Sequence, residues 1–241
     1  MSKTITPYNT AEAKKKQVQT MFDNIAPKYD LLNRILSFGI DVYWRNVAIK
    51  ALKKYDPKYI LDVACGTGDF SIAALKTNPE KIIGVDISTE MLEAGKKKIA
   101  AKKLENKIEL IKGDSEQLLF DDKSFDAVTV AFGVRNFENL DIGIKEMYRV
   151  LKTNAPLIIL EFSKPKIFPV KQLFNFYFKA ICPIIGRLLS KDARAYTYLY
   201  ESVSAFPEGE FFLQHLRDAG FKTTTCRRLT FGICSMYIAI K

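Results

Sequence analysis

The chain has 241 residues, of which 48% are hydrophobic and 27% are charged, with 12 Gly and 9 Pro. This composition is typical of a globular protein and excludes collagen-like, low-complexity and intrinsically disordered chains. No continuous run reaches about 18 apolar residues, and the lysine-rich stretch from Met1 to Gln19 lacks an apolar segment. We therefore predict neither a transmembrane helix nor a secretory signal, and we expect a cytoplasmic protein.

The cysteines and the single histidine offer few ligands for a soft metal ion. Their spacings match neither a CxxC motif nor a zinc-binding pattern. We expect reduced, mostly buried thiols and no metal site. The residues concerned are Cys65, Cys182, Cys226, Cys234 and His215.

The net charge of +10 is distributed unevenly along the chain. Residues 1–60 and 161–241 each carry a net charge of +6, whereas residues 61–160 carry −2, and 15 of the 29 aromatic residues lie in 161–241. Basic and aromatic flanks fit an RNA groove, an anionic membrane surface or a cap over a flat apolar substrate. A solvated basic face over an aromatic core has the same composition, so charge does not decide between these.

Two amphipathic helices are predicted before the core of the domain. Val18, Met21, Phe22 and Ile25 follow the i, i+3, i+4, i+7 spacing of a buried helix face. The apolar residues between Ile40 and Leu52 extend the same spacing over three turns.

An alternation of strands and helices follows. We predict strands at Tyr59–Ala64, Lys81–Asp86, Lys107–Lys112, Phe125–Ala131 and Leu157–Phe162, and helices at Asp69–Lys76, Ser88–Lys103 and Glu138–Lys152. Several of the strands are continuous apolar runs, as expected where helices cover both faces of a sheet. This alternation predicts an α/β fold with a doubly wound, mostly parallel sheet.

The alternation stops after Pro165. Phe168–Phe206 is rich in aromatic residues, and we predict a helical insertion that is broken at Pro183. A helix at Glu208–Ala219 and an antiparallel hairpin around Gly232, with strands Phe221–Thr230 and Ile233–Ile240, complete a seven-stranded sheet.

We expect one domain with four segments. Residues 1–56 form N-terminal helices, 57–163 a cofactor-binding core, 164–206 the helical insertion, and 207–241 the C-terminal helix and hairpin. The N-terminal helices and the insertion are expected to form a lid.

The turn after the first predicted strand is a candidate binding loop. The segment 61–68 reads LDVACGTG, and Gly66 and Gly68 lack the Cβ that would keep a ligand from the backbone. Asp86 lies 18 residues after Gly68, at the end of the second strand, where a carboxylate can accept hydrogen bonds from both hydroxyls of a ribose. The pattern indicates a nucleoside-containing cofactor.

The same loop argues against a dinucleotide. A pyrophosphate site uses a third glycine at the helix N-terminus, whereas Asp69, Phe70 and Ser71 follow Gly68 here, and Asp69 would repel a phosphate. Asp62, just before the loop, suits a cationic ligand. S-adenosylmethionine carries an ammonium and a sulfonium group and no phosphate.

These segments resemble class I methyltransferases, which have a Rossmann-like fold. LDVACGTG resembles their first motif, GVDIS at 84–88 their acidic loop, and GDS at 113–115 the motif that holds adenine. The resemblance implies S-adenosyl-L-methionine as the cofactor. It implies binding residues at Asp62, Gly66, Thr67, Gly68, Asp86, Ile87, Asp114 and Ser115.

Further segments resemble the quinone C-methyltransferases of menaquinone and ubiquinone biosynthesis. YDLLN at 29–33 with Trp44 is similar to their N-terminal signature, and residues 149–163 are similar to their second signature. AFGVRN at 131–136 lies where their motif after the fourth strand lies. The resemblance spans roughly residues 18–240 and implies methylation of the ring of a reduced demethylated prenyl quinone, with demethylmenaquinol favoured over a benzoquinol.

The chain departs from the family pattern at three places. Asp41 stands where the signature usually has histidine, and we assign it no catalytic role. Asn154 and Ala155 replace a Gly-Gly turn, where Asn tolerates the left-handed conformation. Ala131 replaces a serine that contacts the cofactor in some relatives.

The implied reaction needs a way to favour a phenolate. Removing a proton from a ring hydroxyl, with an ordinary pKa near 10, raises the electron density on the adjacent carbon. Arg135 is permanently protonated and can stabilise that oxyanion or orient a water that accepts the proton. We predict catalytic roles for Arg135, its neighbour Asn136 and Tyr29, with Tyr29 contacting the substrate head or closing over the cofactor; Arg135 in a structural ion pair is the alternative.

The helical insertion suggests how the protein reaches a substrate with a lipid tail. Leu173, Phe174, Tyr177, Phe178 and Ile181 are expected to form an apolar stripe. The surrounding basic residues, Lys166, Lys171, Lys179, Arg187, Lys191 and Arg194, predict peripheral association with an anionic membrane. An aromatic helix packed on the core would show the same pattern.

Three other functions are weighed against this one. An amino-methylating nucleic-acid enzyme would place a clamp of Asn or Asp, two prolines and an aromatic residue where AFGVRN stands, so no nucleic-acid partner is expected. A methyltransferase for another apolar acceptor and a non-catalytic protein that binds S-adenosylmethionine share the cofactor motifs. The sequence does not decide between naphthoquinol and benzoquinol, nor whether the chain forms a homo-oligomer.

Overall fold

A computed structural model describes residues 5–8, 10–182, 184, 192 and 194–241. A seven-stranded sheet has the strand order β3-β2-β1-β4-β5-β7-β6. The strands are β1 (Tyr59–Val63), β2 (Lys81–Asp86), β3 (Ile108–Lys112), β4 (Ala127–Ala131), β5 (Pro156–Phe162), β6 (Thr223–Leu229) and β7 (Cys234–Ile240). The first five are parallel, and β7 runs antiparallel to both β5 and β6. The prediction of a mostly parallel α/β sheet closed by a hairpin is confirmed.

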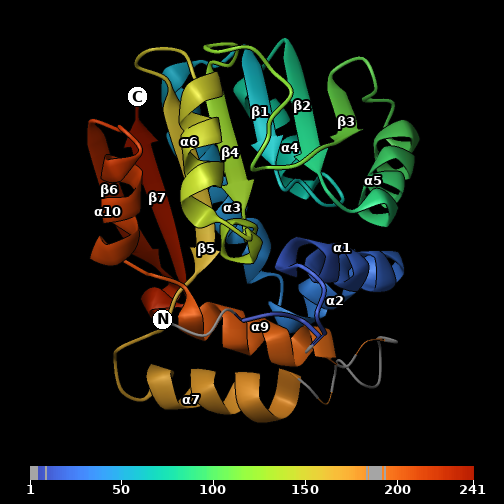
Figure 1. Cartoon of the computed structure of the whole chain (residues 1–241), viewed down its shortest axis with the longest axis vertical. Coiled ribbons are helices and arrows are strands. Elements are labelled where there is room, and N and C mark those ends of the chain that lie inside the picture. The colour runs from blue at the N-terminus through green and yellow to red at the C-terminus, as the bar shows by residue number, and fades with distance from the viewer. Residues whose placement is uncertain (1–4, 9, 183, 185–191, 193) are drawn as a thin grey trace.

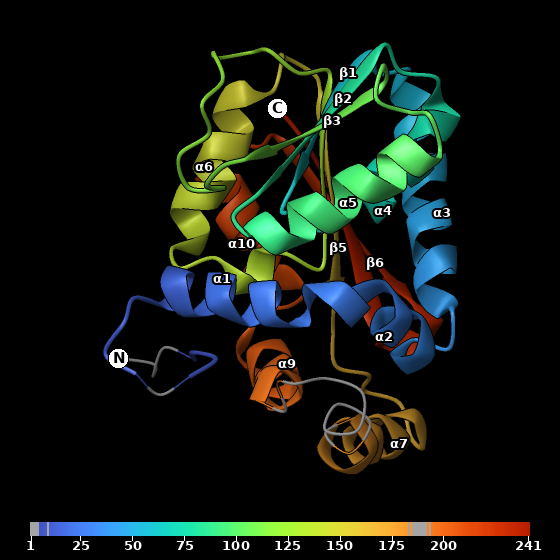
Figure 2. The same ribbon diagram turned by 90° about the vertical axis from the view of Figure 1, so that its right-hand side faces the viewer.

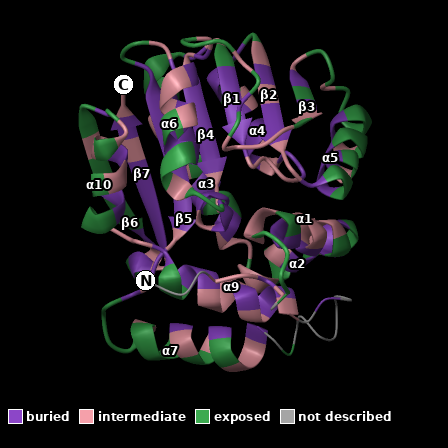
Figure 3. Cartoon of the chain, viewed as in Figure 1, coloured by how far each residue is buried: buried purple, intermediate pink, exposed green. Residues whose placement is uncertain are grey.

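Helices cover both faces of this sheet (Figures 1 and 2). One face carries α6 (Leu140–Val150) and α10 (Glu210–Asp218). The other carries α3 (Ile40–Leu52), α4 (Asp69–Ala74) and α5 (Thr89–Ala101). Because both faces are covered, the central strands are almost wholly buried (Figure 3).

A third helical layer lies across the carboxyl ends of the parallel strands (Figure 2). It contains α1 (Lys14–Ile25), α2 (Tyr29–Leu36), α7 (Val170–Phe176), the π-helical turn η5 (Tyr177–Ile181) and α9 (Arg194–Ala205). Its own apolar cluster joins Val18 and Met21 of α1 to Phe174 and Phe178 of the insertion and Tyr198 of α9. The two ends of this layer are far apart in the sequence, so the layer exists only in the folded chain.

The helix boundaries follow local capping signals. Ser88 precedes α5, and its hydroxyl accepts a hydrogen bond from the Met91 N–H; Asn139 does the same for Ile142 at α6. These two helices therefore begin one to two residues later than predicted. Asn154, in the turn before β5, has a φ of +63°, the left-handed conformation that asparagine tolerates.

Two further differences from the prediction concern α2 and β4. A third N-terminal helix, α2, lies between the two predicted ones, and Gly39, with φ of +74°, separates it from α3. Phe125 does not belong to β4, because it forms only an isolated bridge to Leu151 where the strands diverge. The predicted break at Pro183 lies outside the described residues, as do Arg187 and Lys191.

The described chain also contains short 3₁₀ helices. They are η1 (Ala26–Lys28), η2 (Lys53–Tyr55), η3 (Leu75–Thr77), η4 (Val134–Asn136) and η6 (Thr230–Gly232). The four cysteines are free thiols. Within the described ranges, no helix combines the length and the apolarity needed to cross a bilayer.

Candidate active site

The loop after β1 bends sharply at the carboxyl edge of the sheet. Ala64, Gly66 and Gly68 have φ angles of +52°, +54° and +78°. Glycine adopts positive φ without strain, whereas alanine and the similarly placed Phe132 (φ +60°) at the end of β4 do not. Strained residues at two neighbouring strand ends indicate a backbone held in shape for a ligand.

Asp86 at the end of β2 holds this loop. Its Oδ2 accepts a hydrogen bond from the Gly66 N–H at 2.7 Å, and its Oδ1 accepts one from the Ser88 N–H at 2.9 Å. Burial raises the pKa of Asp86, and these backbone bonds offset part of the rise. Each carboxylate oxygen keeps a second lone pair, so Asp86 can still accept hydrogen bonds from two vicinal hydroxyls.

A cavity of about 70 Å³, which we call the sheet-edge cavity, lies beside Asp86. Five residues predicted to bind the cofactor line it: Gly66, Asp86, Ile87, Asp114 and Ser115. They come from the ends of β1, β2 and β3, which the parallel sheet brings to one edge.

Helix α1 covers the sheet-edge cavity. Lys15 lines it and places its Nζ 2.6 Å from Asp114 Oδ2. Lys14 donates hydrogen bonds to the carbonyl oxygens of Arg135 at 3.2 Å and Phe137 at 2.7 Å. The N-terminal helix is thus tied to the loops after β3 and β4.

Three other predicted cofactor residues do not line this cavity. Asp62 is fully buried inside the fold, where it accepts hydrogen bonds from Ser71 Oγ at 2.5 Å and Thr129 Oγ1 at 2.9 Å. Burial raises its pKa to about 6. Gly68 precedes α4, and the Thr67 hydroxyl donates to Asp30 at 2.6 Å. These residues shape the loop.

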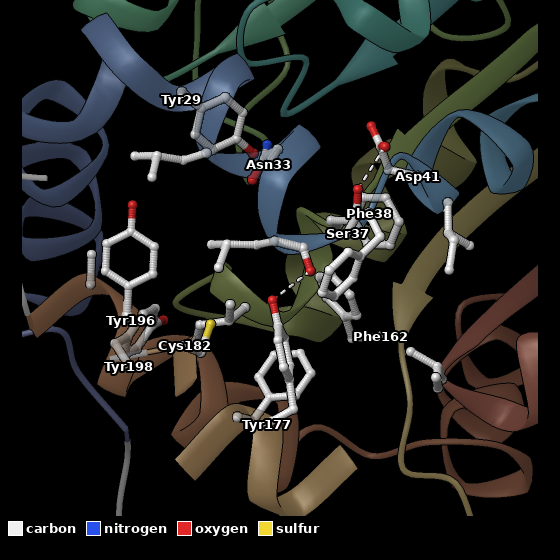
Figure 4. Close-up of a pocket in the computed structure, with 18 of the residues that line it drawn as sticks. Tyr29, Asn33, Ser37, Phe38, Asp41, Phe162, Tyr177, Cys182, Tyr196 and Tyr198 are labelled. Atoms are coloured by element: carbon white, nitrogen blue, oxygen red, sulfur yellow. Dashed lines mark hydrogen bonds between the residues drawn. The ribbon is translucent and has the colours of Figure 1, made fainter. Parts of the chain in front are cut away.

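A larger cavity of about 340 Å³, which we call the helical cavity, lies between the sheet edge and the third helical layer (Figure 4). Its wall is mainly apolar and aromatic. The rings of Phe132 and Phe162 are 4.7 Å apart, and Trp44 packs 5.8 Å from Phe132. Other apolar lining residues are Met21, Ile25, Leu32, Leu173, Phe174 and Phe178.

The two cavities share a wall. Phe22, Tyr29, Phe132 and Asn136 line both of them. A ligand in the helical cavity would therefore lie next to a ligand in the sheet-edge cavity. Tyr29 and Asn136, both predicted to be catalytic, stand at this junction.

Arg135, the third predicted catalytic residue, lines the helical cavity and forms a buried ion pair. Its Nη1 lies 2.8 Å from Glu161 Oε1, with side chains 8% and 0% exposed. The same nitrogen also donates to the Phe132 carbonyl oxygen. Burial raises the pKa of Glu161, and Arg135 opposes the rise. Both interpretations of Arg135 therefore have a structural basis, since an ion-paired guanidinium here also faces a ligand cavity.

Sequence reasoning missed several polar residues of the helical cavity. Asp41 lines it and pairs with Arg45, while Ser37 Oγ donates to Asp41 at 2.7 Å (Figure 4). Tyr177 and Tyr198 line it from the insertion. The spacing of Asp41 and Arg45 at four residues was the available signal, since it places both on one face of α3.

The sheet-edge cavity suits a nucleoside cofactor. Asp86 offers acceptors for hydroxyls, Asp114 and Ser115 offer polar atoms, and Ile87 and Phe137 offer apolar faces for a flat base. Among the described residues, no group of three or more His, Cys, Asp or Glu side chains could hold a metal ion.

Comparison with solved structures places this fold among methyltransferases. A SAM-dependent methyltransferase from Thermotoga maritima has a TM-score of 0.62 at 19% identity, covering 92% of this chain and 99% of that one. A SAM-dependent methyltransferase from Aquifex aeolicus has a TM-score of 0.57 at 20% identity, covering 80% and 88%. At these identities the likeness concerns the fold.

Sequence relatives are much closer. A demethylmenaquinone methyltransferase of Bacteroides fragilis is 51% identical over 238 residues, covering 98% of this chain and 97% of the relative. One from Porphyromonas gingivalis is 45% identical over 239 residues, covering 98% of each. The model of the ubiE/COQ5 methyltransferase family matches residues 10–241. With this match over nearly its whole length, the chain belongs to the ubiE/COQ5 methyltransferase family.

Proposed function

We propose that this chain is an S-adenosylmethionine-dependent C-methyltransferase that converts demethylmenaquinol to menaquinol. The observation that carries the proposal is the shared wall between the sheet-edge cavity and the large aromatic helical cavity. The names of the relatives at 51% and 45% identity support the same reaction. Methylation of a benzoquinol in the same cavity is the alternative acceptor chemistry.

The cofactor is assigned to the sheet-edge cavity. Asp86 would accept hydrogen bonds from the ribose hydroxyls, Asp114 and Ser115 would hold the adenine edge, and Ile87 would pack on its face. Gly66 lets the backbone approach closely. When bound, S-adenosylmethionine supplies an electrophilic methyl group on a positively charged sulfur.

The quinol head is assigned to the helical cavity. Phe132, Phe162 and Trp44 present aromatic faces to a flat ring, and offset contacts between such rings contribute about 0.5–1.5 kcal/mol each. Tyr29 and Asn136 lie where the ring must meet the cofactor. Orientation of two bound reactants can supply roughly 7–11 kcal/mol of the barrier, so positioning carries much of the rate.

Arg135 supplies the fixed charge of the site. Its guanidinium stays protonated and favours the phenolate form of a bound quinol by electrostatic attraction. Glu161 holds Arg135 in place at 2.8 Å. A water oriented by Arg135 passes the phenolic proton on to solvent, and the anionic ring then has the electron density that its carbon needs.

The test is a labelling experiment with the purified protein. Methyl-labelled S-adenosylmethionine is incubated with a reduced short-tailed demethylmenaquinone or with a benzoquinol precursor, and products are identified by mass spectrometry. We expect one methyl group on the naphthoquinol ring carbon, and much less label with Asp86→Ala at a cofactor concentration that does not saturate the variant. Label on the benzoquinol alone would assign the alternative acceptor. Label on neither acceptor, with the cofactor bound, would refute a quinone substrate.

The mouth of the helical cavity points to peripheral membrane binding in the cytoplasm. Phe38 and Leu173 line the cavity although they are 77% and 63% exposed. Residues 162–182 contain four Lys and no Asp or Glu. Each basic residue near an anionic bilayer contributes about 1 kcal/mol, so such a surface takes a lipid-tailed substrate from the membrane.

Vesicle flotation tests the membrane surface. We expect binding to vesicles with anionic lipid and little binding to zwitterionic vesicles. Leu173→Ser with Phe176→Ser should weaken it, whereas Phe211→Ser is the control, because Phe211 is 78% exposed on another helix, α10. Flotation that ignores lipid charge, or an equal loss with Phe211→Ser, would contradict this surface.

A further inference from the structure

Three buried side-chain atoms have no hydrogen-bond partner among the described residues: Arg135 Nε, Asn136 Oδ1 and Tyr198 Oη. Leaving a buried polar atom unpaired costs about 1–3 kcal/mol, so such atoms are rare and need a reason. All three residues line the helical cavity. Two of the atoms are N–H or O–H donors and one is an acceptor, a set that matches a ligand with oxygen and hydroxyl groups.

Tyr198 belongs to a different part of the chain from the other two. It lies on α9, which packs against the η4 turn that carries Arg135 and Asn136. The side chain is 2% exposed, and both Arg135 and Glu161 act on it electrostatically. Burial raises the pKa of Tyr198 to about 12, so its hydroxyl stays a donor at neutral pH.

Other polar groups of the helical cavity already have partners. The Tyr177 hydroxyl donates to the Leu36 carbonyl oxygen at 2.8 Å (Figure 4). Asp41 accepts from Ser37 and pairs with Arg45. A ligand that bound these groups would have to break existing bonds, whereas Tyr198 offers a bond that the protein itself does not use.

We propose that Tyr198 is a substrate-binding residue that orients the aromatic diol in the helical cavity. Tyr198 Oη–H and Arg135 Nε–H donate to one ring oxygen, and Asn136 Oδ1 accepts from a hydroxyl of the same diol. This inference rests on the proposed function and adds a contact from the insertion. It explains how α9 fixes the position of the ring against the η4 turn.

The same geometry predicts a preference for a ring with free hydroxyl groups. A ring hydroxyl can donate to Asn136 Oδ1, whereas a ring whose oxygens are both methylated cannot. We therefore expect the wild-type protein to bind a short-tailed demethylmenaquinol more tightly than its di-O-methyl ether.

Binding is measurable without turnover. The single Trp of the chain, Trp44, lines the helical cavity, so quenching of its fluorescence reports a ring bound there. The probes are the short-tailed demethylmenaquinol, kept anaerobic, and its di-O-methyl ether. The variants are Tyr198→Phe and, as the matched control from the same cavity, Tyr177→Phe.

For Tyr198→Phe we expect roughly ten-fold weaker binding of the quinol and an unchanged or higher Tm. A hydroxyl with only a structural role would instead lower the Tm on removal. Tyr177→Phe should lower the Tm, because it removes a bond to the backbone, and leave the preference for the quinol intact.

The outcomes separate this inference from the proposed function. Wild-type quenching by the quinol with equal affinity in Tyr198→Phe would overturn the role of Tyr198. If the wild-type protein binds neither probe, the quinone assignment itself fails.

Discussion

The two cavities are built by different means. The sheet-edge cavity consists of short loops at the ends of β1, β2 and β3, and its polar groups are already engaged, as with Asp86 on two backbone N–H groups. The helical cavity is five times larger by volume, about 340 Å³ against 70 Å³, and is lined by residues from Met21 to Ile233. The three residues that carry unpaired buried polar atoms in the described part of the chain also line it.

This difference indicates which cavity determines specificity for the acceptor. A loop at a strand end presents its backbone in one shape, so the sheet-edge cavity suits a ligand of fixed structure. The helical cavity is closed by side chains from separate helices, and its shape changes with each of them. We therefore expect substitutions at the sheet edge to affect the cofactor, and substitutions in the helical layer to affect the acceptor.

The largest effect is expected for Arg135→Ala, which leaves Glu161 buried without a partner. Removal of one member of a buried pair costs about 3–5 kcal/mol, so the free energy of unfolding should fall by that amount. Cofactor affinity should stay close to wild type because Arg135 does not line the sheet-edge cavity. Urea denaturation and calorimetry measure the two quantities.

A second substitution separates the charge of Arg135 from its structural role. Arg135→Ala with Glu161→Gln removes the unpaired carboxylate and should regain much of the stability. Turnover should stay low, because the cation over the helical cavity is still missing. Recovery of turnover together with stability would reduce Arg135 to a structural partner.

Asp62 tests whether the sheet interior belongs to the cofactor site. Burial raises its pKa to about 6 from an ordinary value near 3.9. Its contribution to stability is therefore full below about pH 4 and is lost as the pH rises through 6, a difference of about 3 kcal/mol. Asp62→Asn should remove this pH dependence and leave cofactor affinity unchanged.

Denaturation of the wild-type protein and of Asp62→Asn between pH 4 and 7 measures how the free energy of unfolding depends on pH. The advantage of the variant should grow toward pH 7. Parallel curves of unfolding free energy against pH would mean that the carboxyl group titrates normally. Weaker cofactor binding by the variant would support the predicted role of Asp62 in the cofactor site.

Asp86→Ala should weaken cofactor binding by about 10- to 100-fold, since hydrogen bonds to a charged acceptor contribute about 1.5–3 kcal/mol. Asp86→Asn keeps one acceptor and should lose less. Quenching of Trp44 by the quinol should be unaffected in both, because Asp86 does not line the helical cavity. Retained cofactor affinity in Asp86→Ala would refute the assignment to ribose.

The smallest effect concerns the cover over the sheet-edge cavity. Lys15 and Asp114 are about one-third exposed, and an ion pair of this kind contributes about 0–1 kcal/mol. Lys15→Ala should speed cofactor association up to about five-fold in stopped-flow mixing if α1 opens to admit it. An unchanged rate would place the entry path elsewhere.

Most residues of the sheet-edge cavity could be predicted from the sequence, because each belongs to a short motif at the end of a strand. Gly66 and Asp86 lie at ends of apolar strands, and parallel strands bring their carboxyl ends to one edge. Asp62 shows the limit of that reasoning. Its position before the loop was clear, but only the folded sheet shows its side chain bonded to Ser71 and Thr129.

The order of strands and helices, the glycine loop with its acidic partner and the family resemblance could all be predicted from the sequence. They depend on periodicity and short spacing. The remaining features are contacts between distant segments, which only the tertiary structure shows. Only packing brings Tyr198 of α9 beside the η4 turn that carries Arg135, ties α1 across the sheet edge and, within the described part of the chain, leaves polar atoms of three cavity-lining residues unpaired. Contacts between residues far apart in the chain have no local pattern, because they arise from how helices pack.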